Sequence, residues 1–251
     1  MSFFEIDVDH KRYGERTILR GLRLQLARGE IVSLIGASGC GKSSLLGIAA
    51  GLDRDAAARV RLDGAEWDVG RTRPGAGIGM VFQEPRLFPW LTVVENIVFG
   101  TGARKLPPGT LDGLLDEVGL GGLGEQLPKQ LSGGQAQRVA LARGLFTQPR
   151  VLLLDEPFSA VDAITRIRLQ DLLARVARER GLTVLMVTHD IDEAVQLSDR
   201  VVLLANQPGP ARAVFDIDLP RPRVRTGARA DARAAALKAE LLAALDLGLA
   251  A

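Results

Sequence analysis

The sequence has little cysteine, few aromatic residues and no excess of either charge. Its one cysteine, Cys40, excludes an internal disulfide and suits a reducing compartment. Aromatic residues make up 4% of the chain, and 32 basic side chains are balanced by 30 acidic ones. The basic stripe with interleaved aromatics that is typical of nucleic-acid-binding proteins is missing, so we expect no nucleic acid among the partners.

Long apolar stretches are also missing. No run approaches the roughly 20 residues that cross a bilayer. The segment Met1–Asp7 lacks the basic and apolar regions of a signal peptide. We therefore expect any role at a membrane to come through a partner.

One local basic cluster interrupts this even charge distribution. It consists of Arg221, Arg223, Arg225, Arg229 and Arg233. A solvated surface segment is the simpler interpretation, and a contact with anionic lipid or a protein partner is the alternative.

The residues that are abundant predict a buried α/β core. Hydrophobic residues make up 47% of the 251 positions and charged residues 25%, as in ordinary globular proteins. Short apolar runs predict buried strands with helical patterns between them. The predicted strands are Ile31–Ile35, Gly79–Gln83, Val151–Leu154, Thr183–Val187 and Val201–Leu204, and the predicted helices include Lys42–Ala50 and Ala163–Arg180. This alternation predicts a mostly parallel sheet.

Other parts of the chain have a different pattern. Further strands are predicted at Phe3–Val8, Ile18–Leu26 and Arg59–Trp67, the last with a hairpin turn at Asp63-Gly64. From residue 84 to 150 the pattern is mostly helical, which predicts an insertion into the sheet. After Leu219 the periodic apolar pattern ends at Pro-Arg-Pro-Arg. A final amphipathic helix is expected at about 229–247.

Two capping boxes mark helix starts within the insertion. Thr92 with Glu95 precedes an expected helix at 93–99, and Ser132 with Gln135 precedes one at 136–147.

A glycine-rich loop after the strand Ile31–Ile35 fits the pattern Gly-x4-Gly-Lys-[Ser/Thr]. The loop reads Gly36-Ala37-Ser38-Gly39-Cys40-Gly41-Lys42-Ser43 and is followed by Ser44. Glycines let backbone N–H groups turn inward around an anion, and the start of the next helix adds its positive dipole end. Lys42 is suited to the β- and γ-phosphates of a nucleotide and the Ser43 hydroxyl to Mg²⁺. The loop predicts a Mg-ATP site.

Cys40 lies inside this loop. The simpler interpretation is a small residue that fits the available space. The alternative is a thiol made reactive by the helix terminus.

Two further positions carry groups suited to the same chemistry. Asp155 and Glu156 end the buried strand Val151–Leu154, and ligands of open α/β sheets bind at the carboxyl ends of strands. We expect Asp155 to bind Mg²⁺ and Glu156 to polarise the attacking water. His189 follows the strand Thr183–Val187 and is expected to contact the γ-phosphate or that water, although a lone histidine is often structural.

A second anion-binding construction is predicted at the capping box of the insertion. Ser132 offers a hydroxyl, and Gly133 and Gly134 offer N–H groups at a positive helix end, followed by Gln135. An ordinary helix start is the alternative.

Here the sequence resembles the ABC (ATP-binding cassette) ATPases. Leu131–Gln135, continuing as Ala-Gln-Arg-Val-Ala-Leu-Ala-Arg, is similar to their signature motif. The remaining motifs stand in the order of that family: Tyr13 as the adenine-stacking aromatic, Gly36–Ser43 as Walker A, Gln83 as the Q-loop, Val151–Glu156 as Walker B, Ser159–Asp162 as the D-loop and His189 as the switch histidine.

The resemblance implies a fold, a site and an assembly. The fold would be an α/β P-loop NTPase core (residues 1–83 and 151–225) with a small antiparallel β subdomain, an inserted α-helical subdomain (84–150) and a helical tail (226–251). Gln83 would contact Mg²⁺ and sense a permease. Two copies would pair head to tail, so that Ser132–Gln135 and Asp162 serve the nucleotide held by the partner's Walker A loop. A packed surface tyrosine remains the alternative for Tyr13.

The resemblance extends to a stand-alone importer subunit. Gln83-Glu-Pro-Arg-Leu-Phe-Pro-Trp-Leu91 and Leu219-Pro-Arg-Pro-Arg223 are similar to the nitrate/sulfonate/taurine branch. Leu87, Phe88 and Trp90 would present an apolar surface to a permease, although Phe88 and Trp90 could instead pack within the insertion. The implied place is the cytoplasmic face of the inner membrane, with a solute-binding protein as an indirect partner. An exporter subunit, or a non-transport ABC ATPase acting on nucleic acid or a protein assembly, is the alternative.

Overall fold

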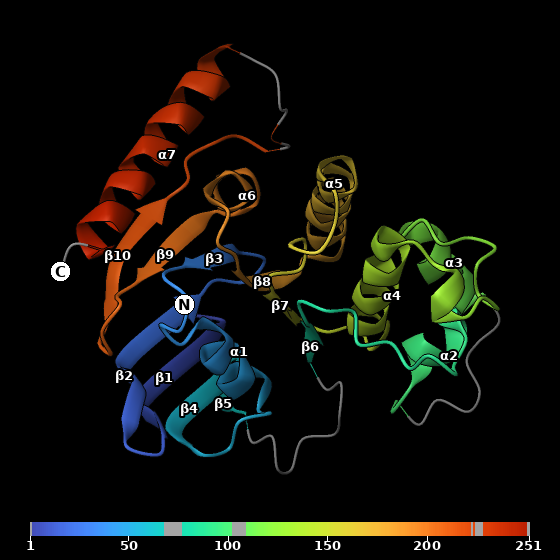
Figure 1. Cartoon of the computed structure of the whole chain (residues 1–251), viewed down its shortest axis with the longest axis horizontal. Helices are drawn as coiled ribbons and strands as arrows, with labels where there is room; N and C mark the ends of the chain where they lie inside the picture. Colours follow the sequence, from blue (N-terminus) through green and yellow to red (C-terminus); the bar gives the residue numbers. More distant parts are fainter. Residues whose placement is uncertain (1, 68–76, 102–108, 222, 224–227, 250–251) are drawn as a thin grey trace. The chain divides into compact units, whose positions relative to one another are not determined.

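The computed structural model of the chain describes residues 2–67, 77–101, 109–221, 223 and 228–249 (Figure 1). The chain divides into two compact units. The first unit consists of Met1–Arg71 and Thr183–Ala251, and the second of Thr72–Leu182. Neither boundary coincides with the expected insertion at 84–150, which stays a prediction.

An antiparallel sheet opens the first unit. Its strand order is β2-β1-β4-β5, with β1 at Phe4–Tyr13, β2 at Arg16–Leu26, β4 at Ala56–Leu62 and β5 at Ala65–Glu66. Alternate residues of β1 are buried at its start, where Phe4, Ile6 and Val8 have 0–1% exposure. Asp63 and Gly64 join β4 to β5 with positive φ angles of 55° and 78°, as a tight hairpin turn requires. The predicted small antiparallel β subdomain is confirmed.

The second sheet of the first unit is mostly parallel. Its order is β10-β9-β3-β8, with β3 at Ile31–Ile35, β8 at Thr183–Val187, β9 at Arg200–Leu204 and β10 at Ala211–Asp216. β8, β3 and β9 run parallel, and β10 runs antiparallel to β9. Every residue of β3 and β8 is buried, which explains their continuous apolar sequences.

Within the described part of the first unit there are three helices, α1 at Lys42–Ala50, α6 at Ile191–Leu197 and α7 at Ala228–Leu249. α7 lies along β10 and α6 (Figure 1) and buries Leu237 and Leu241, which are one helical turn apart, against Val201, Leu203 and Ile217. The final helix was predicted, but α6 and β10 were not. α6 has only seven residues, and β10 is half-exposed along its length.

Part of the arginine cluster has an unexpected role. Arg221 donates to the carbonyl of Leu197 at 2.7 Å, and Arg223 donates to the carbonyls of residues 195 and 196 at 3.1 and 3.0 Å and to that of Ile217 at 3.3 Å. These carbonyls include the last ones of α6, which have no partner within the helix. Burial lowers the pKa of Arg223 to about 10. For Arg223, which is half-buried, the interpretation as a solvated segment was wrong, because it caps a helix of its own unit; Arg221 caps the same helix and stays exposed.

The rest of the cluster differs. Arg233 is exposed and pairs with Asp218 at 3.0 Å, as a solvated residue does. Arg225 lies outside the described residues, as does the side chain of Arg229.

The second unit contains a short parallel strand pair and most of the helices. β6 is at Ile78–Val81, β7 at Val151–Asp155, α2 at Val93–Val98, α3 at Thr110–Glu117, a 3-10 turn at Pro128–Gln130, α4 at Gly133–Phe146 and α5 at Ala163–Arg180. Both predicted capping boxes are present, with Thr92 accepting from the Glu95 N–H and Ser132 from the Gln135 N–H at 3.2 Å. α4 begins at Gly133, three residues earlier than predicted, because the residues directly after the cap are already helical.

Candidate active site

The predicted phosphate loop connects β3 to α1. Gly39 and Gly41 have φ angles of 80° and 102°, which favour glycine. A Cβ at Gly41 would lie 2.5 Å from the Leu19 side chain, and one at Gly36 would lie 2.9 Å from the Cys40 sulfur. Gly41 is therefore required for backbone conformation and for space, Gly39 for its backbone conformation and Gly36 for space.

Lys42 is buried and folded over this loop. Its ammonium donates to the carbonyls of Gly36 at 2.7 Å and Ala37 at 2.9 Å. The N-cap of α1, Gly41, has no side chain to satisfy the first N–H groups of the helix, and the first turn holds no acidic residue. A helix start without a side-chain cap and a buried cation together favour an anion such as a phosphate.

Three more loop residues differ in exposure. Cys40 is 8% exposed, with its sulfur 3.9 Å from the Lys42 ammonium. Its burial fits the space-filling interpretation, and its predicted reactivity stays a prediction. Ser43 is exposed and Ser44 half-buried.

Tyr13 lies beside the start of α1. Its hydroxyl is 3.4 Å from the Ser44 hydroxyl, and the residue is 55% exposed. An exposed aromatic ring whose hydroxyl contacts Ser44, the residue after the phosphate loop, is suitably placed to stack on a nucleotide base.

His189 leaves the sheet at the same edge as the loop. β3 and β8 are parallel neighbours with Leu34 opposite Val187, so Gly36 and His189 each lie two residues beyond a paired position. His189 is exposed, and Asp190 caps α6 directly after it by accepting from the Glu193 N–H at 3.1 Å. A strand end and a capped helix start thus hold His189 from both sides.

The second unit brings Gln83 and Glu156 together. β6 and β7 are parallel, and both residues follow their carboxyl ends. The Gln83 amide donates to the Glu156 carboxylate at 3.5 Å. Glu156 has a φ of 44°, an unusual backbone conformation for a residue with a side chain, and Ser159 donates to its carbonyl at 3.0 Å. Such strain is common at functional sites.

The predicted signature residues start α4. Space surrounds Gly133, where an added Cβ would meet nothing within 4 Å, but a Cβ at Gly134 would overlap the Thr165 side chain of α5. Asp162 caps α5 by accepting from the N–H groups of Ile164 and Thr165 at 3.0 Å. Hydrogen bonds from Thr165 lower the pKa of the Asp162 carboxyl. Asp162 thus has a structural role in this unit, whatever it does for a nucleotide.

Sequence reasoning missed the residues that fix the segment after Gln83. Asn96 is fully buried; its amide donates to the carbonyls of Phe88, Leu91 and Thr92, and its oxygen accepts from the Phe88 N–H at 2.8 Å. Arg143 of α4 donates to the carbonyls of residues 85 and 86 at 2.7 and 3.0 Å. Motif spacing offers no signal for such contacts, since an asparagine in a short helix has many possible roles.

The apolar side chains of this segment have a mixed environment. Phe88 is half-buried against Phe99 and Trp90, with ring centroids 4.2 and 5.6 Å apart. Trp90 is 71% exposed and Phe99 53%. The expected exposure of these side chains and the alternative of internal packing are therefore each met in part, because Phe88 packs within the second unit while Trp90 faces solvent.

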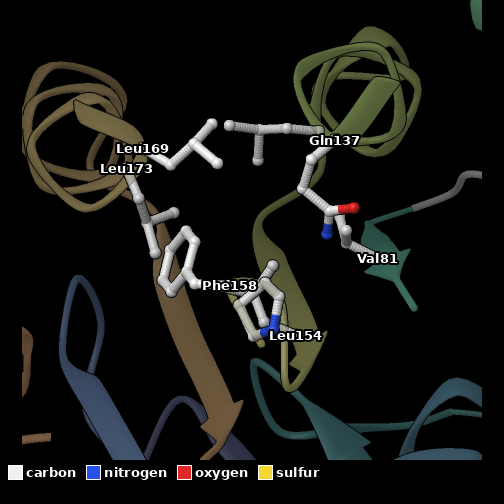
Figure 2. A pocket seen from close by; sticks show the side chains of 8 residues that line it. Val81, Gln137, Leu154, Phe158, Leu169 and Leu173 are labelled. Carbon is white, nitrogen blue, oxygen red and sulfur yellow. The ribbon is translucent and has the colours of Figure 1, made fainter. Parts of the chain in front are cut away.

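A small pocket of the second unit is a separate feature. It lies between α4 and α5 above the end of β7, where Gln137, Leu169, Leu173 and Phe158 point into it (Figure 2). Its volume is about 10 Å³, close to the space of a single water, and its walls are mostly apolar. It is far too small for a nucleotide.

Comparison with known proteins decides the family. The sequence model of the ABC transporter family matches residues 19–159. The aliphatic sulfonates import ATP-binding protein SsuB 1 of Xanthomonas axonopodis pv. citri is 57% identical over 250 residues, covering 97% of this chain and 96% of that protein. The chain belongs to the ABC transporter family. As an ATP-binding cassette of this family it is an ATPase, and it is the energy-coupling subunit of an importer.

Further relatives agree with this assignment. The protein SsuB 2 of Burkholderia cenocepacia, also named for aliphatic sulfonates import, is 51% identical to the cassette over 96% of this chain and 87% of its own. Among solved structures, the dimeric ATP-binding cassette MJ0796 in a post-hydrolysis state with ADP and phosphate has a TM-score of 0.74 and 31% identity, covering 86% of this chain and 99% of that one. CbiO1 from Clostridium perfringens has a TM-score of 0.76 and 29% identity, covering 86% and 89%. The predicted ABC ATPase fold is confirmed.

Proposed function

We propose that the cassette powers the import of aliphatic sulfonates. The observation that carries this proposal is the 57% identity to a sulfonate-import subunit along nearly the full length of both chains. Nitrate and taurine, which the sequence resemblance also suggested, are alternative solutes. A chain that binds nucleotide is not expected to touch the solute, so the assignment rests on relatives and has to be tested by transport.

A growth experiment separates these solutes. A strain lacking the gene is supplied with an aliphatic sulfonate, taurine or sulfate as the sole sulfur source, and with nitrate as the sole nitrogen source. The cassette should restore growth on the aliphatic sulfonate, and the Lys42→Ala variant should not. If the cassette restored growth on taurine or nitrate but not on the aliphatic sulfonate, taurine or nitrate would become the assigned solute.

ATP is proposed to bind with Mg²⁺. The donors assigned to the ion are the Ser43 hydroxyl, the Gln83 amide oxygen and the Asp155 carboxylate, all hard oxygen ligands of the kind Mg²⁺ prefers. When bound, the ion neutralises charge on the phosphates.

The proposed roles of the protein groups follow from their surroundings. Lys42 and the loop N–H groups bind the phosphates, and Tyr13 stacks on the adenine. Glu156, whose carboxylate accepts a hydrogen bond from Gln83, orients the attacking water and accepts its proton. His189 contacts the γ-phosphate.

The nucleotide is proposed to lie between two copies of the cassette. The start of α4, Ser132–Gln135, and Asp162 would then complete the site on the partner copy. The openness at Gly133 supports this role, because an added Cβ there would meet no atom of the described residues within 4 Å. A two-fold pair would give two equivalent sites.

The segment around Trp90 is the proposed permease-binding surface. Trp90 and Phe99 are exposed apolar side chains on a backbone fixed by the buried Asn96, next to the proposed nucleotide-sensing Gln83. Exposed aromatic residues are enriched where proteins bind one another. Among the described residues, no helix is both long and apolar enough to cross a membrane. The importer role supports a proposed peripheral position on the cytoplasmic face of the inner membrane, held by a permease.

Trp90→Ala tests this surface. Losing an aromatic anchor should weaken assembly with the permease about 10-fold or more and reduce uptake accordingly. ATP hydrolysis by the isolated cassette should stay unchanged. Val214→Ala, which removes an apolar side chain that is 54% exposed on β10, is the matched control and should affect neither property. Normal uptake by Trp90→Ala would contradict the proposed surface.

A further inference from the structure

A buried lysine of β1 forms an ion pair at the phosphate-loop helix. Lys11 is 2% exposed, although it lies at the end of a strand whose neighbouring residues face solvent. Its ammonium is 2.6 Å from a carboxylate oxygen of Asp53 and 3.3 Å from the carbonyl of Asp55. Asp53 lies just beyond Gly51, which ends α1, so the pair joins β1 to the far end of the helix.

The same pair contacts Tyr13 from two sides. The Lys11 ammonium lies 4.6 Å from the centroid of the tyrosine ring, within the range of a cation–π contact. The Tyr13 hydroxyl donates to the second oxygen of Asp53 at 3.3 Å and lies 3.4 Å from the Ser44 hydroxyl. The ring is thus held over one face and at its tip, yet the residue remains 55% exposed.

Both members of the pair stay charged at neutral pH. The hydrogen bond to Asp53 raises the pKa of Lys11 above its usual value. Burial raises the pKa of Asp53, but hydrogen bonds from Lys11 and the Asp55 backbone outweigh it and leave that pKa below its usual value. A cation is therefore present beside the ring at neutral pH.

We infer that Lys11 and Asp53 are positioning residues for nucleotide binding, which hold Tyr13 with one face covered and the other open to the base of ATP. This inference rests on the proposed stacking role of Tyr13. A free tyrosine would have to give up its side-chain freedom when a base stacks on it, whereas a ring that is already held does not. The cation on the covered face also draws electron density from the ring, which favours stacking with an electron-rich purine.

The pair could instead serve only to join β1 to α1, so the test needs a ligand without a base. Inorganic tripolyphosphate can occupy the phosphate loop but cannot stack on Tyr13. Binding of ATP and of tripolyphosphate to the full-length cassette is measured by titration calorimetry for the wild type, Lys11→Met, Asp53→Asn, Tyr13→Ala and the double variant Lys11→Met/Tyr13→Ala. Thermal unfolding without ligand identifies variants that fail to fold. If Lys11→Met fails to fold, Asp53→Asn, which keeps the side-chain shape, takes its place in the comparison.

Lys11→Met should weaken ATP binding about 3- to 10-fold, the effect of releasing one side chain, and change tripolyphosphate binding less than about twofold. The double variant should bind ATP no more weakly than Tyr13→Ala. Equal losses for both ligands, or additive losses in the double variant, would overturn the inference and leave a purely structural pair. If Tyr13→Ala itself binds ATP normally, the proposed stacking role fails as well. If only Tyr13→Ala loses affinity, stacking stands and the role of Lys11 is refuted.

Discussion

Replacing Glu156 by glutamine should abolish turnover while leaving ATP bound. The amide keeps the shape of the carboxylate and can still accept the hydrogen bond from Gln83, so the loop structure around the strained backbone should persist. It cannot accept a proton from water, and loss of a general base costs a factor of about 10²–10⁴ in rate. With hydrolysis blocked, ATP should hold two copies together, and the variant should elute as a dimer in Mg-ATP.

Glu179→Gln is the matched control for this variant. Glu179 lies on α5 of the same unit, is half exposed and pairs with Arg175 one turn away at 3.7 Å. It should keep wild-type turnover and should not dimerise stably. Turnover by Glu156→Gln within tenfold of the wild type, or a monomer at saturating Mg-ATP, would contradict the assigned role.

The second large effect is expected from Lys42→Ala. The ammonium supplies the buried positive charge of the loop and also holds the carbonyls of Gly36 and Ala37. A hydrogen bond to a charged group contributes about 1.5–3 kcal/mol, so ATP binding should weaken by about 100-fold. Calorimetric titration with Mg-ATP measures this directly. The exposed Lys129→Ala is the control for loss of one positive charge and should bind ATP normally. Unchanged affinity of Lys42→Ala would refute the phosphate-loop assignment.

The sequence predicted best the elements whose ends carry their own signals. α1 runs over the predicted residues because Gly41 and Gly51, both in the left-handed conformation, bracket it. α5 does so because Asp162 caps its start and Gly181 ends it. α6 is too short for a helical period to show, although Asp190 caps its start, and β10 is not fully buried on either side.

The site was predictable in its residue types but not in its supporting contacts. The motifs predicted the loop, the acidic pair and the signature helix. The strained backbone of Glu156, the close packing of Gly134 on Thr165 and the burial of Lys11 depend on segments distant in the sequence. The same reason applies to Arg223, because its carbonyl partners in α6 lie more than 20 residues earlier in the sequence. A local pattern contains no trace of such partners.

The most direct test concerns the claim that one ATP site needs two copies of the cassette. Two variants are prepared, each expected to be inactive alone. Lys42→Ala damages the phosphate loop, and Gly133→Asp places a negative charge at the start of α4. Gly133 has free space around it, and an acidic residue suits a helix start, so the second variant should fold normally.

ATP hydrolysis is then measured for each variant alone and for an equal mixture. In a mixed pair, the intact loop of the Gly133→Asp copy meets the intact signature of the Lys42→Ala copy, so one of the two sites is complete. Random pairing makes half of the pairs mixed, and the mixture should recover up to about a quarter of wild-type activity. A mixture no more active than the two variants measured separately would contradict the shared site.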